Sequence, residues 1–220
     1  MEHILTLYHQ PYDPQRPMIC FDEQTLQLLK QTRPPIAVRP GHAHREDHEY
    51  KRNGTRNVFI FADPKAGRRH TLVTRRRTKQ DFAYAMRYLV DVLYPKATCI
   101  DVVLDNLNTH TYLALVETFG KSEADRIAAR LSFHFTPTHA SWLNMAEIEL
   151  SVLGRQCLDG YIASVLALLE ETAAWEMERN TAEATVDWRF TTADARIKLK
   201  KLYPILHPID NVKEPLHIKA

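Results

Sequence analysis

The chain has 220 residues, of which 45% are hydrophobic and 25% are charged, and its formal net charge is +2. These values are ordinary for a globular protein, and the length suits one domain with a core of its own. No apolar run approaches the length that crosses a bilayer, and the first residues lack the order of a signal peptide. We therefore expect a cytoplasmic protein without contact to a membrane.

The cysteines and a histidine-rich segment are the first candidates for metal chemistry. Cys20, Cys99 and Cys157 lie far apart without a Cys-x-x-Cys spacing, which predicts buried free thiols and neither a disulfide framework nor a cysteine zinc site. The polar segment 41–53 contains four possible zinc ligands, which are His42, His44, Asp47 and His48. Their spacing matches no ligand pattern that a helix or strand supports, so a loop is the better interpretation.

Strands dominate the first third of the chain. Residues 1–17 form an N-terminal extension, in which residues 3–8 could end a helix. The apolar residues 18–22 predict a first strand that ends at Asp22, and a second apolar stretch covers 26–29. Residues 57–62 and 70–74 predict two further strands, and the turn residues between them favour an antiparallel hairpin.

Helices and strands alternate after this hairpin. Residues 80–93 predict a helix because its apolar residues repeat at the spacing of one buried stripe, and Pro95 ends it. A strand at 100–104 and another at 132–136 flank a helical region, 111–130, that is broken near Gly120. The remaining helical patterns cover 144–157, 162–179 and 192–202, and a C-terminal tail follows at 206–220.

Three acids are placed for metal chemistry. Asp22 and Asp105 each follow an apolar strand, and if the two strands pair in parallel, their carboxylates lie about 5 Å apart at one sheet edge. Two Mg²⁺ ions could bind there, and Glu147 in the first turn of a helix could complete the site. Simpler interpretations remain open: Asp22 as a turn residue, Asp105 with Asn106 as a helix cap, and Glu147 with Asn144 as a capping pair.

Neighbouring polar residues are weaker candidates. Glu23 points to the strand face opposite Asp22, and Glu149 lies about 200° around its helix from Glu147. Asp101 stands at the start of its strand, about 13 Å from the edge where Asp105 lies. His110 and His139 are close in sequence to candidate acids, and either could equally be a structural histidine.

A basic segment at 65–79 contains no acid. Its charged residues are Lys65, Arg68, Arg69, Arg75, Arg76, Arg77 and Lys79. Such a run is consistent with a solvated face and also with a polyanionic partner.

The chain resembles a known family in four segments that occur in the right order. They are VVLDNLNTH at 102–110, TPTHASWLNMAE at 136–147, Arg179-Asn180, and WRFTTADAR at 188–196. Together they resemble the insertion-sequence transposases of the mariner superfamily, specifically the bacterial family called insertion sequence six-thirty. The resemblance covers nearly the whole chain.

The resemblance implies an α/β, ribonuclease-H-like fold over residues 18–205, with a mixed sheet of three antiparallel strands plus two parallel strands, flanked by helices. It implies that Asp22, Asp105 and Glu147 are the catalytic residues. The same three acids would be the ligands of two metal ions, which would be Mg²⁺ or Mn²⁺. It further implies cut-and-paste transposition into TA dinucleotides of double-stranded DNA, by a homodimer associated with the nucleoid. Residues that orient the site or the phosphate would be Asn106, His110, His139 and Asn144. Residues on the DNA backbone would be Arg68, Arg69, Arg75, Arg76, Arg77 and Lys79.

The chain departs from the family at two places. Members often carry a lysine where Thr138 stands and a basic pair where Gly160 and Tyr161 stand. Such transposases usually begin with helix-turn-helix modules, which have no room before Asp22, so we expect the catalytic half. Two alternatives remain: another nuclease of the same fold, such as a resolvase or ribonuclease H, and a catalytically idle remnant that binds DNA or the full-length transposase.

Overall fold

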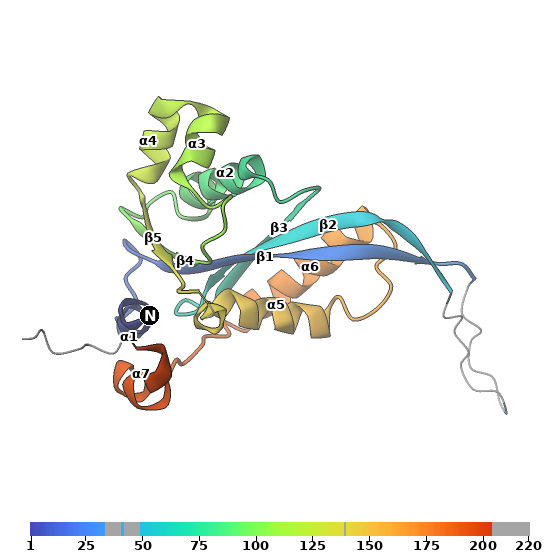
Figure 1. Ribbon diagram of the computed structural model, residues 1–220. Helices are drawn as coiled ribbons and strands as arrows, with labels where there is room; N and C mark the ends of the chain where they lie inside the picture. Colours follow the sequence, from blue (N-terminus) through green and yellow to red (C-terminus); the bar gives the residue numbers. More distant parts are fainter. Residues whose placement is uncertain (34–40, 42–48, 139, 204–220) are drawn as a thin grey trace, which may run out of the picture.

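The computed structural model describes residues 1–33, 41, 49–138 and 140–203. Five strands form one mixed sheet in the order β3-β2-β1-β4-β5 (Figure 1). The antiparallel part consists of β1 (Met18–Gln31), β2 (Tyr50–Asp63) and β3 (Arg68–Thr74). Two strands parallel to β1 extend the sheet, β4 (Ile100–Leu104) and β5 (Leu131–Phe135). The predicted set of three antiparallel and two parallel strands is confirmed.

Helices cover both faces of this sheet (Figure 1). One face carries α2 (Lys79–Tyr88), α3 (Tyr112–Phe119) and α4 (Lys121–Ala128). The other face carries α5 (Met145–Gln156) and α6 (Val165–Thr181), and α1 (Glu2–His9) lies beside α7 (Thr192–Lys198). Short turns complete the set: the π-helical η1 (Leu89–Leu93) and the 3₁₀ turns η2 (Ser141–Leu143) and η3 (Lys200–Leu202). Among the residues described, no helix combines the length and apolar character needed to span a membrane.

Local capping explains where the helices begin. Thr78 and Asp81 form a capping box at the start of α2, and Thr191 and Asp194 form another at α7. Gly120 separates α3 from α4 with a φ of 80°, a conformation that glycine adopts without strain. The break expected near Gly120 is therefore confirmed.

The first two strands are longer than the sequence predicted. β1 does not end at Asp22, since it pairs with β2 as far as Gln31, which lies opposite Tyr50. β2 accordingly begins at Tyr50, inside the segment 41–53 that was expected to be a loop. Polar side chains in this outer part hide its strand character, because hydrogen bonds between the two backbones hold much of it, with Leu28 as a buried apolar anchor.

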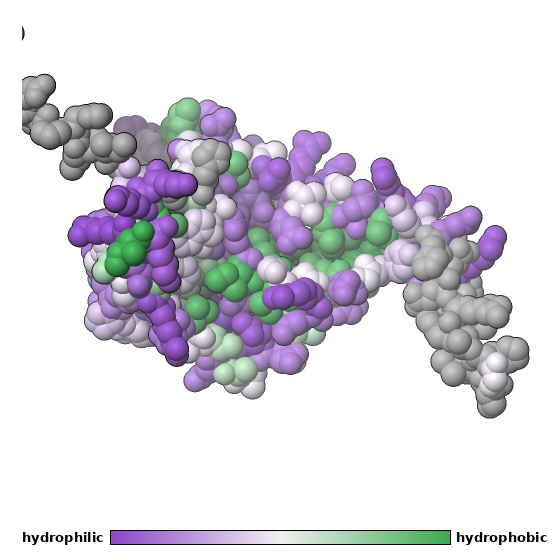
Figure 2. Space-filling model, turned by 60° about the horizontal axis from the view of Figure 1, so that its bottom comes forward, coloured by the Kyte–Doolittle hydropathy of each residue, from purple (hydrophilic) through white to green (hydrophobic). Residues whose placement is uncertain are grey.

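Alternating side chains along β1 belong to two separate hydrophobic cores, one on each face of the sheet. Met18 and Cys20 point to the face of α5, whereas Ile19 and Phe21 point to the face of α2. Figure 2, which looks onto the side where α5 and α7 lie in Figure 1, shows apolar side chains gathered between hydrophilic ones. All three cysteines are free, and Cys20 is buried, whereas Cys99 and Cys157 are only partly buried.

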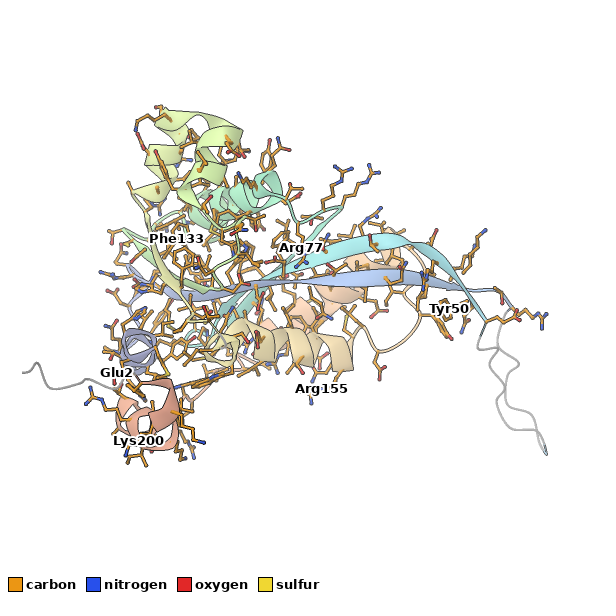
Figure 3. The ribbon with its side chains drawn as sticks, in the orientation of Figure 1. Glu2, Tyr50, Arg77, Phe133, Arg155 and Lys200 are labelled. Atoms are coloured by element: carbon orange, nitrogen blue, oxygen red, sulfur yellow. The ribbon has the colours of Figure 1, made fainter. Side chains whose placement is uncertain are left out.

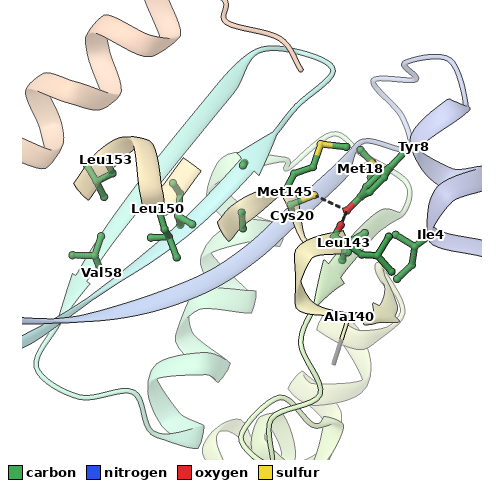
Figure 4. Packing of buried hydrophobic residues seen from close by; sticks show 14 of the residues in the cluster. Ile4, Tyr8, Met18, Cys20, Val58, Ala140, Leu143, Met145, Leu150 and Leu153 are labelled. Atoms are coloured by element: carbon green, nitrogen blue, oxygen red, sulfur yellow. Dashed lines mark hydrogen bonds between the residues drawn. The ribbon is translucent and has the colours of Figure 1, made fainter. Parts of the chain in front are cut away.

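The first helix belongs to the core on the α5 side of the sheet. The Tyr8 hydroxyl donates a hydrogen bond to the carbonyl oxygen of Leu143 and lies 3.6 Å from Sγ of Cys20 (Figure 4). Ile4, also in α1, is fully buried in the same cluster. Helix α1 therefore packs against η2, the turn that directly precedes Asn144 and α5.

Candidate active site

The sheet register places Asp22 beside Asp105. Cys20 of β1 lies opposite Val103 of β4 in the parallel pair, and the two acids follow two residues later on each strand. Neighbouring strands are about 4.8 Å apart, so the two acids emerge side by side. Asp22 was expected at the end of a strand, but β1 continues beyond it. The parallel pairing, and not the strand, ends at this point.

Asn144 connects Asp22 to the start of α5. Its Nδ2 donates to the carbonyl oxygen of Phe21 at 2.9 Å and lies 3.4 Å from Oδ2 of Asp22. Its Oδ1 accepts a hydrogen bond from the backbone N–H of Ala146 at 3.2 Å and so caps the helix. One buried amide therefore fixes the position of α5 relative to the first acid.

The Asp22 carboxylate is half-buried and surrounded by negative charge. Burial is the largest cause that raises its pKa, and together with the charges of Asp105, Glu23 and Glu147 it outweighs a hydrogen bond from the backbone of Glu23 and brings the pKa to about 7. That hydrogen bond, from the Glu23 N–H to Oδ1 of Asp22, is 2.8 Å long. A cation among these carboxylates would favour the ionised form of Asp22.

Glu147 lies in the first turn of α5 and is exposed to solvent. Asn144, which contacts Asp22, caps the same helix, so Glu147 follows that contact by three residues. As the side chains stand, however, no three acids, histidines or cysteines in the described part of the chain come close enough to hold a metal ion. The fold brings the three predicted acids to one region without closing them around a single point.

His110 contacts Asp105 directly. Its Nδ1 lies 2.8 Å from Oδ1 of Asp105 and 3.2 Å from the backbone carbonyl oxygen of the same residue. The angle at the nitrogen suits the carbonyl oxygen, and Oδ1 is buried without a hydrogen-bond partner among the described residues. The contact between the ring and the carboxylate is therefore a close contact between opposite charges.

Glu23 lies on the other side of the same ring. Oε2 of Glu23 is 3.4 Å from Nε2 of His110, and the rings of Phe21 and Phe82 enclose the imidazole. Burial alone would lower the pKa of His110, but the carboxylates of Asp105 and Glu23 outweigh it and raise the pKa to about 9. The buried imidazole of His110 therefore lies between the carboxylates of Asp105 and Glu23.

Glu23 was set aside in the sequence because it faces away from Asp22. It does face the α2 side, yet it is buried and reaches both His110 and Arg77, whose Nη1 lies 3.7 Å from Oε1. No motif marks this role, because the contact joins β1 to the loop before α3 and depends on the packing of both.

One residue of the predicted DNA-backbone surface, Arg69, is not on the surface. Arg69 is fully buried, and its Nη2 lies 2.6 Å from Oε1 of Glu149, which also contacts Arg179 at 3.1 Å. The pleat of β3 turns Arg69 toward the face that α5 and α6 cover, so it cannot lie on a DNA backbone. Glu149 does face away from Glu147, as expected, and is buried by this contact.

Four other basic residues of this segment are exposed to solvent. Arg75, Arg76 and Arg77 are exposed between β3 and α2, and Figure 3 shows Arg77 above the sheet. Arg68 is also exposed, whereas Nζ of Lys79 lies 3.1 Å from a carboxylate oxygen of Glu117.

Some predicted residues contribute little to the described site. Asn106 is exposed beside Asp105, and Thr138 is exposed at the end of the same described segment. Tyr161 packs its ring 6.4 Å from the ring of Tyr50. Asp101 is buried, and its carboxylate accepts two hydrogen bonds from Arg16. His139 and the four possible zinc ligands at 42, 44, 47 and 48 lie outside the described residues.

Comparisons with known proteins identify the family and the fold of the chain. Residues 17–168 match the family described as DDE superfamily endonuclease. No curated protein matches the chain.

Among solved structures, the Mos1 transposase paired-end complex with left transposon end matches with a TM-score of 0.57 at 13% identity. This match covers 83% of the present chain and 55% of that one. The Mos1 mariner paired end complex with Mn gives 0.53 at 14% identity, with coverages of 83% and 55%. The pre-cleavage Mos1 transpososome gives 0.52 at 12%, with coverages of 86% and 61%. The expected ribonuclease-H-like fold is confirmed, and the chain spans little more than half the length of these transposases.

Proposed function

Because this chain belongs to the DDE superfamily of endonucleases, we propose that it is the catalytic domain of an insertion-sequence transposase. In this proposal it hydrolyses DNA at a transposon end and joins the freed 3′ hydroxyl to target DNA at a TA dinucleotide. The observation that carries the proposal is the register that sets Asp22 beside Asp105, with Glu147 at the start of the adjoining helix α5. The similar Mos1 transposase structure, which contains a transposon end, supports DNA as the partner, and in this proposal the chain binds double-stranded DNA as a homodimer.

The residues present fit a divalent cation. Asp22 is a half-buried carboxylate among other carboxylates, and Asp105 keeps a buried oxygen without a hydrogen-bond partner in the described structure. Mg²⁺ and Mn²⁺ prefer such oxygen ligands. Asp22 and Asp105 would share two ions, and Glu147 would hold one of them. When bound, the ions would activate the attacking oxygen and stabilise the leaving one.

The surrounding side chains have distinct roles in this proposal. Asn144 orients Asp22, and His110 orients Asp105, by the contacts described above. Asn106 and His139 would lie beside the reacting phosphate. The residues that would follow the DNA backbone are Arg68, Arg75, Arg76, Arg77 and Lys79.

The test is metal-dependent cleavage of duplex DNA that carries the insertion-sequence ends. Asp105→Asn and Glu147→Gln should each abolish cleavage and joining, whereas the exposed controls Asp159→Asn and Glu170→Gln should keep them. Holliday junctions and RNA–DNA hybrids serve as competing substrates. Preferred cleavage of either would identify another nuclease of the same fold, and DNA binding without any cleavage would identify an idle remnant.

A further inference from the structure

Strands β1 and β2 extend beyond the rest of the sheet as a two-stranded ribbon (Figure 1). Pairing between β1 and β4 ends at Cys20, and pairing between β2 and β3 reaches only to Asn57. Residues 26–31 and 50–56 therefore pair only with each other. Nothing in the catalytic site requires so long a projection.

The outer part of this ribbon, residues 24–31 and 50–57, carries positive charge and no acid. Its basic residues are Lys30, Lys51, Arg52 and Arg56. Lys30, Lys51 and Arg52 are exposed, and in the described part of the chain none of the three forms an ion pair. Figure 2 shows hydrophilic side chains at this end of the molecule.

The register makes this charge costly for the isolated protein. Lys30 lies directly opposite Lys51 across the antiparallel pair. Like charges in that position weaken strand pairing. Some exposed bases elsewhere are paired with acids, as in the contacts of Arg126 with Asp91 and Arg196 with Glu2. An anionic partner would remove the repulsion that the ribbon carries alone.

The ribbon is also held in place. The Leu29 N–H donates to the carbonyl oxygen of Ile162 at 2.9 Å, and Nδ2 of Asn53 donates to that of Ala163 at 2.7 Å. Both contacts tie the ribbon to the loop between α5 and α6. The bases are therefore presented on a preorganised support, which reduces the entropy cost of binding.

The position of these bases relative to the site suggests the partner. Lys30 follows Asp22 by eight residues on β1, which corresponds to roughly 26 Å, or about eight base pairs of duplex. The pairing of Thr74 with Asn57 brings the start of the segment Arg75 to Arg77 next to Arg56. We infer that the ribbon binds the phosphate backbone of duplex DNA about eight base pairs from the cleavage site, an inference that rests on the proposed function.

The experiment compares two variants with the same change in net charge. One is Lys30→Glu/Lys51→Glu/Arg52→Glu, and the control is Lys96→Glu/Lys200→Glu/Lys201→Glu, whose residues are also exposed. Figure 3 shows Lys200 at the end of the molecule opposite Tyr50. Affinity for a duplex of arbitrary sequence is measured in chelator over a series of salt concentrations, so that the result does not depend on cleavage.

The ribbon variant should bind at least about tenfold more weakly, and the slope of log K against log salt should fall by about 2 to 3, since each phosphate contact contributes about 0.9. The control should stay within about twofold of the parent. Equal losses in both variants, or unchanged binding by the ribbon variant, would overturn the inference. So would loss of self-association with DNA affinity intact, because the ribbon would then face a second copy of the chain.

A neutral variant separates binding from folding. Lys30→Gln/Lys51→Gln/Arg52→Gln removes the repulsion and should keep or raise the melting temperature while still weakening DNA binding. A lower melting temperature together with parental affinity would contradict the inference. If the parent cleaves DNA and the ribbon variants bind DNA as the parent does, the ribbon inference is rejected and the proposed function stands. If DNA binding depends on the ribbon but the parent cleaves no DNA, the proposed function is rejected and the role of the ribbon in binding stands.

Discussion

Nδ1 of His110 lies 2.8 Å from Oδ1 of Asp105, while Nε2 of the same ring lies 3.4 Å from Oε2 of Glu23. The buried ring therefore lies between two carboxylates, that of Asp105 at the edge of the site and that of Glu23 inside the domain. In the proposed metal site, this arrangement would fix the orientation of Asp105 in the way that outer partners orient metal ligands.

We expect His110→Ala to lower metal-dependent cleavage by about 10- to 100-fold, because Asp105 loses its oriented position. The concentration of Mn²⁺ needed for half-maximal cleavage should rise in parallel. The exposed His9→Ala serves as the control and should behave as the parent. An unchanged Mn²⁺ dependence in His110→Ala would show that the ring only fills space.

Asp22 should make stability depend on pH when metal is withheld. Burial and the neighbouring carboxylates raise its pKa from an ordinary 3.8 to about 7, so the folded protein holds a proton that the unfolded chain releases. The resulting destabilisation is absent below pH 4 and complete above pH 7. In chelator, Asp22→Asn should therefore raise the melting temperature by several degrees at pH 8 and by nothing at pH 4. A gain of equal size at both values would point to a cause other than ionisation.

Divalent metal should reverse this destabilisation in the parent. Mg²⁺ or Mn²⁺ at a hundred times the dissociation constant stabilises a protein by about 2.7 kcal/mol, or several degrees for a domain of this size. Asp22→Asn and Asp105→Asn should gain much less. Melting curves of all three proteins with chelator, Mg²⁺ and Mn²⁺ decide the matter: equal shifts in parent and variants would remove these acids from the ligand set.

Glu149 should matter for folding and not for chemistry. Its side chain is 2% exposed, and it neutralises the buried guanidinium group of Arg69 and the partly buried one of Arg179. Glu149→Gln leaves these charges without a counter-ion and should cost about 3 to 5 kcal/mol in urea unfolding. Most cleavage activity per folded molecule should remain. Glu147→Gln, an exposed change in the same helix, should show the opposite pattern, and equal loss of activity from both would mean that the third ligand is misplaced.

Asp101 should support the fold down to acid pH. Burial would raise its pKa, but hydrogen bonds from Arg16 and His134 outweigh burial and lower it below the ordinary 3.8. Its contribution to stability is therefore present above pH 4 and is lost as the pH falls through the lowered pKa. Asp101→Asn should destabilise the protein at pH 7 by about 1 to 3 kcal/mol, and the difference should close as the pH falls through the lowered pKa. The exposed Asp159→Asn should show no such pH dependence.

The order of the elements could be predicted from the sequence, whereas the closeness of Asp22 and Asp105 could be predicted only on the condition that their strands pair in parallel, as they do. Apolar runs such as 100–104, breakers such as Pro95 and Gly120, and capping residues such as Thr78 act within a few positions of themselves. The same is true of the capping role of Asn144 at the start of α5.

Tertiary structure alone decided the remaining features. The length of β1 beyond Asp22, the burial of Arg69 against Glu149, and the place of Glu23 behind His110 each join segments far apart in the chain. The sequence does not show whether a charged residue on a strand is exposed or buried, because the residue type is the same in both cases. The register of the sheet and the helices packed on it determine which charges meet water and which must find a partner inside.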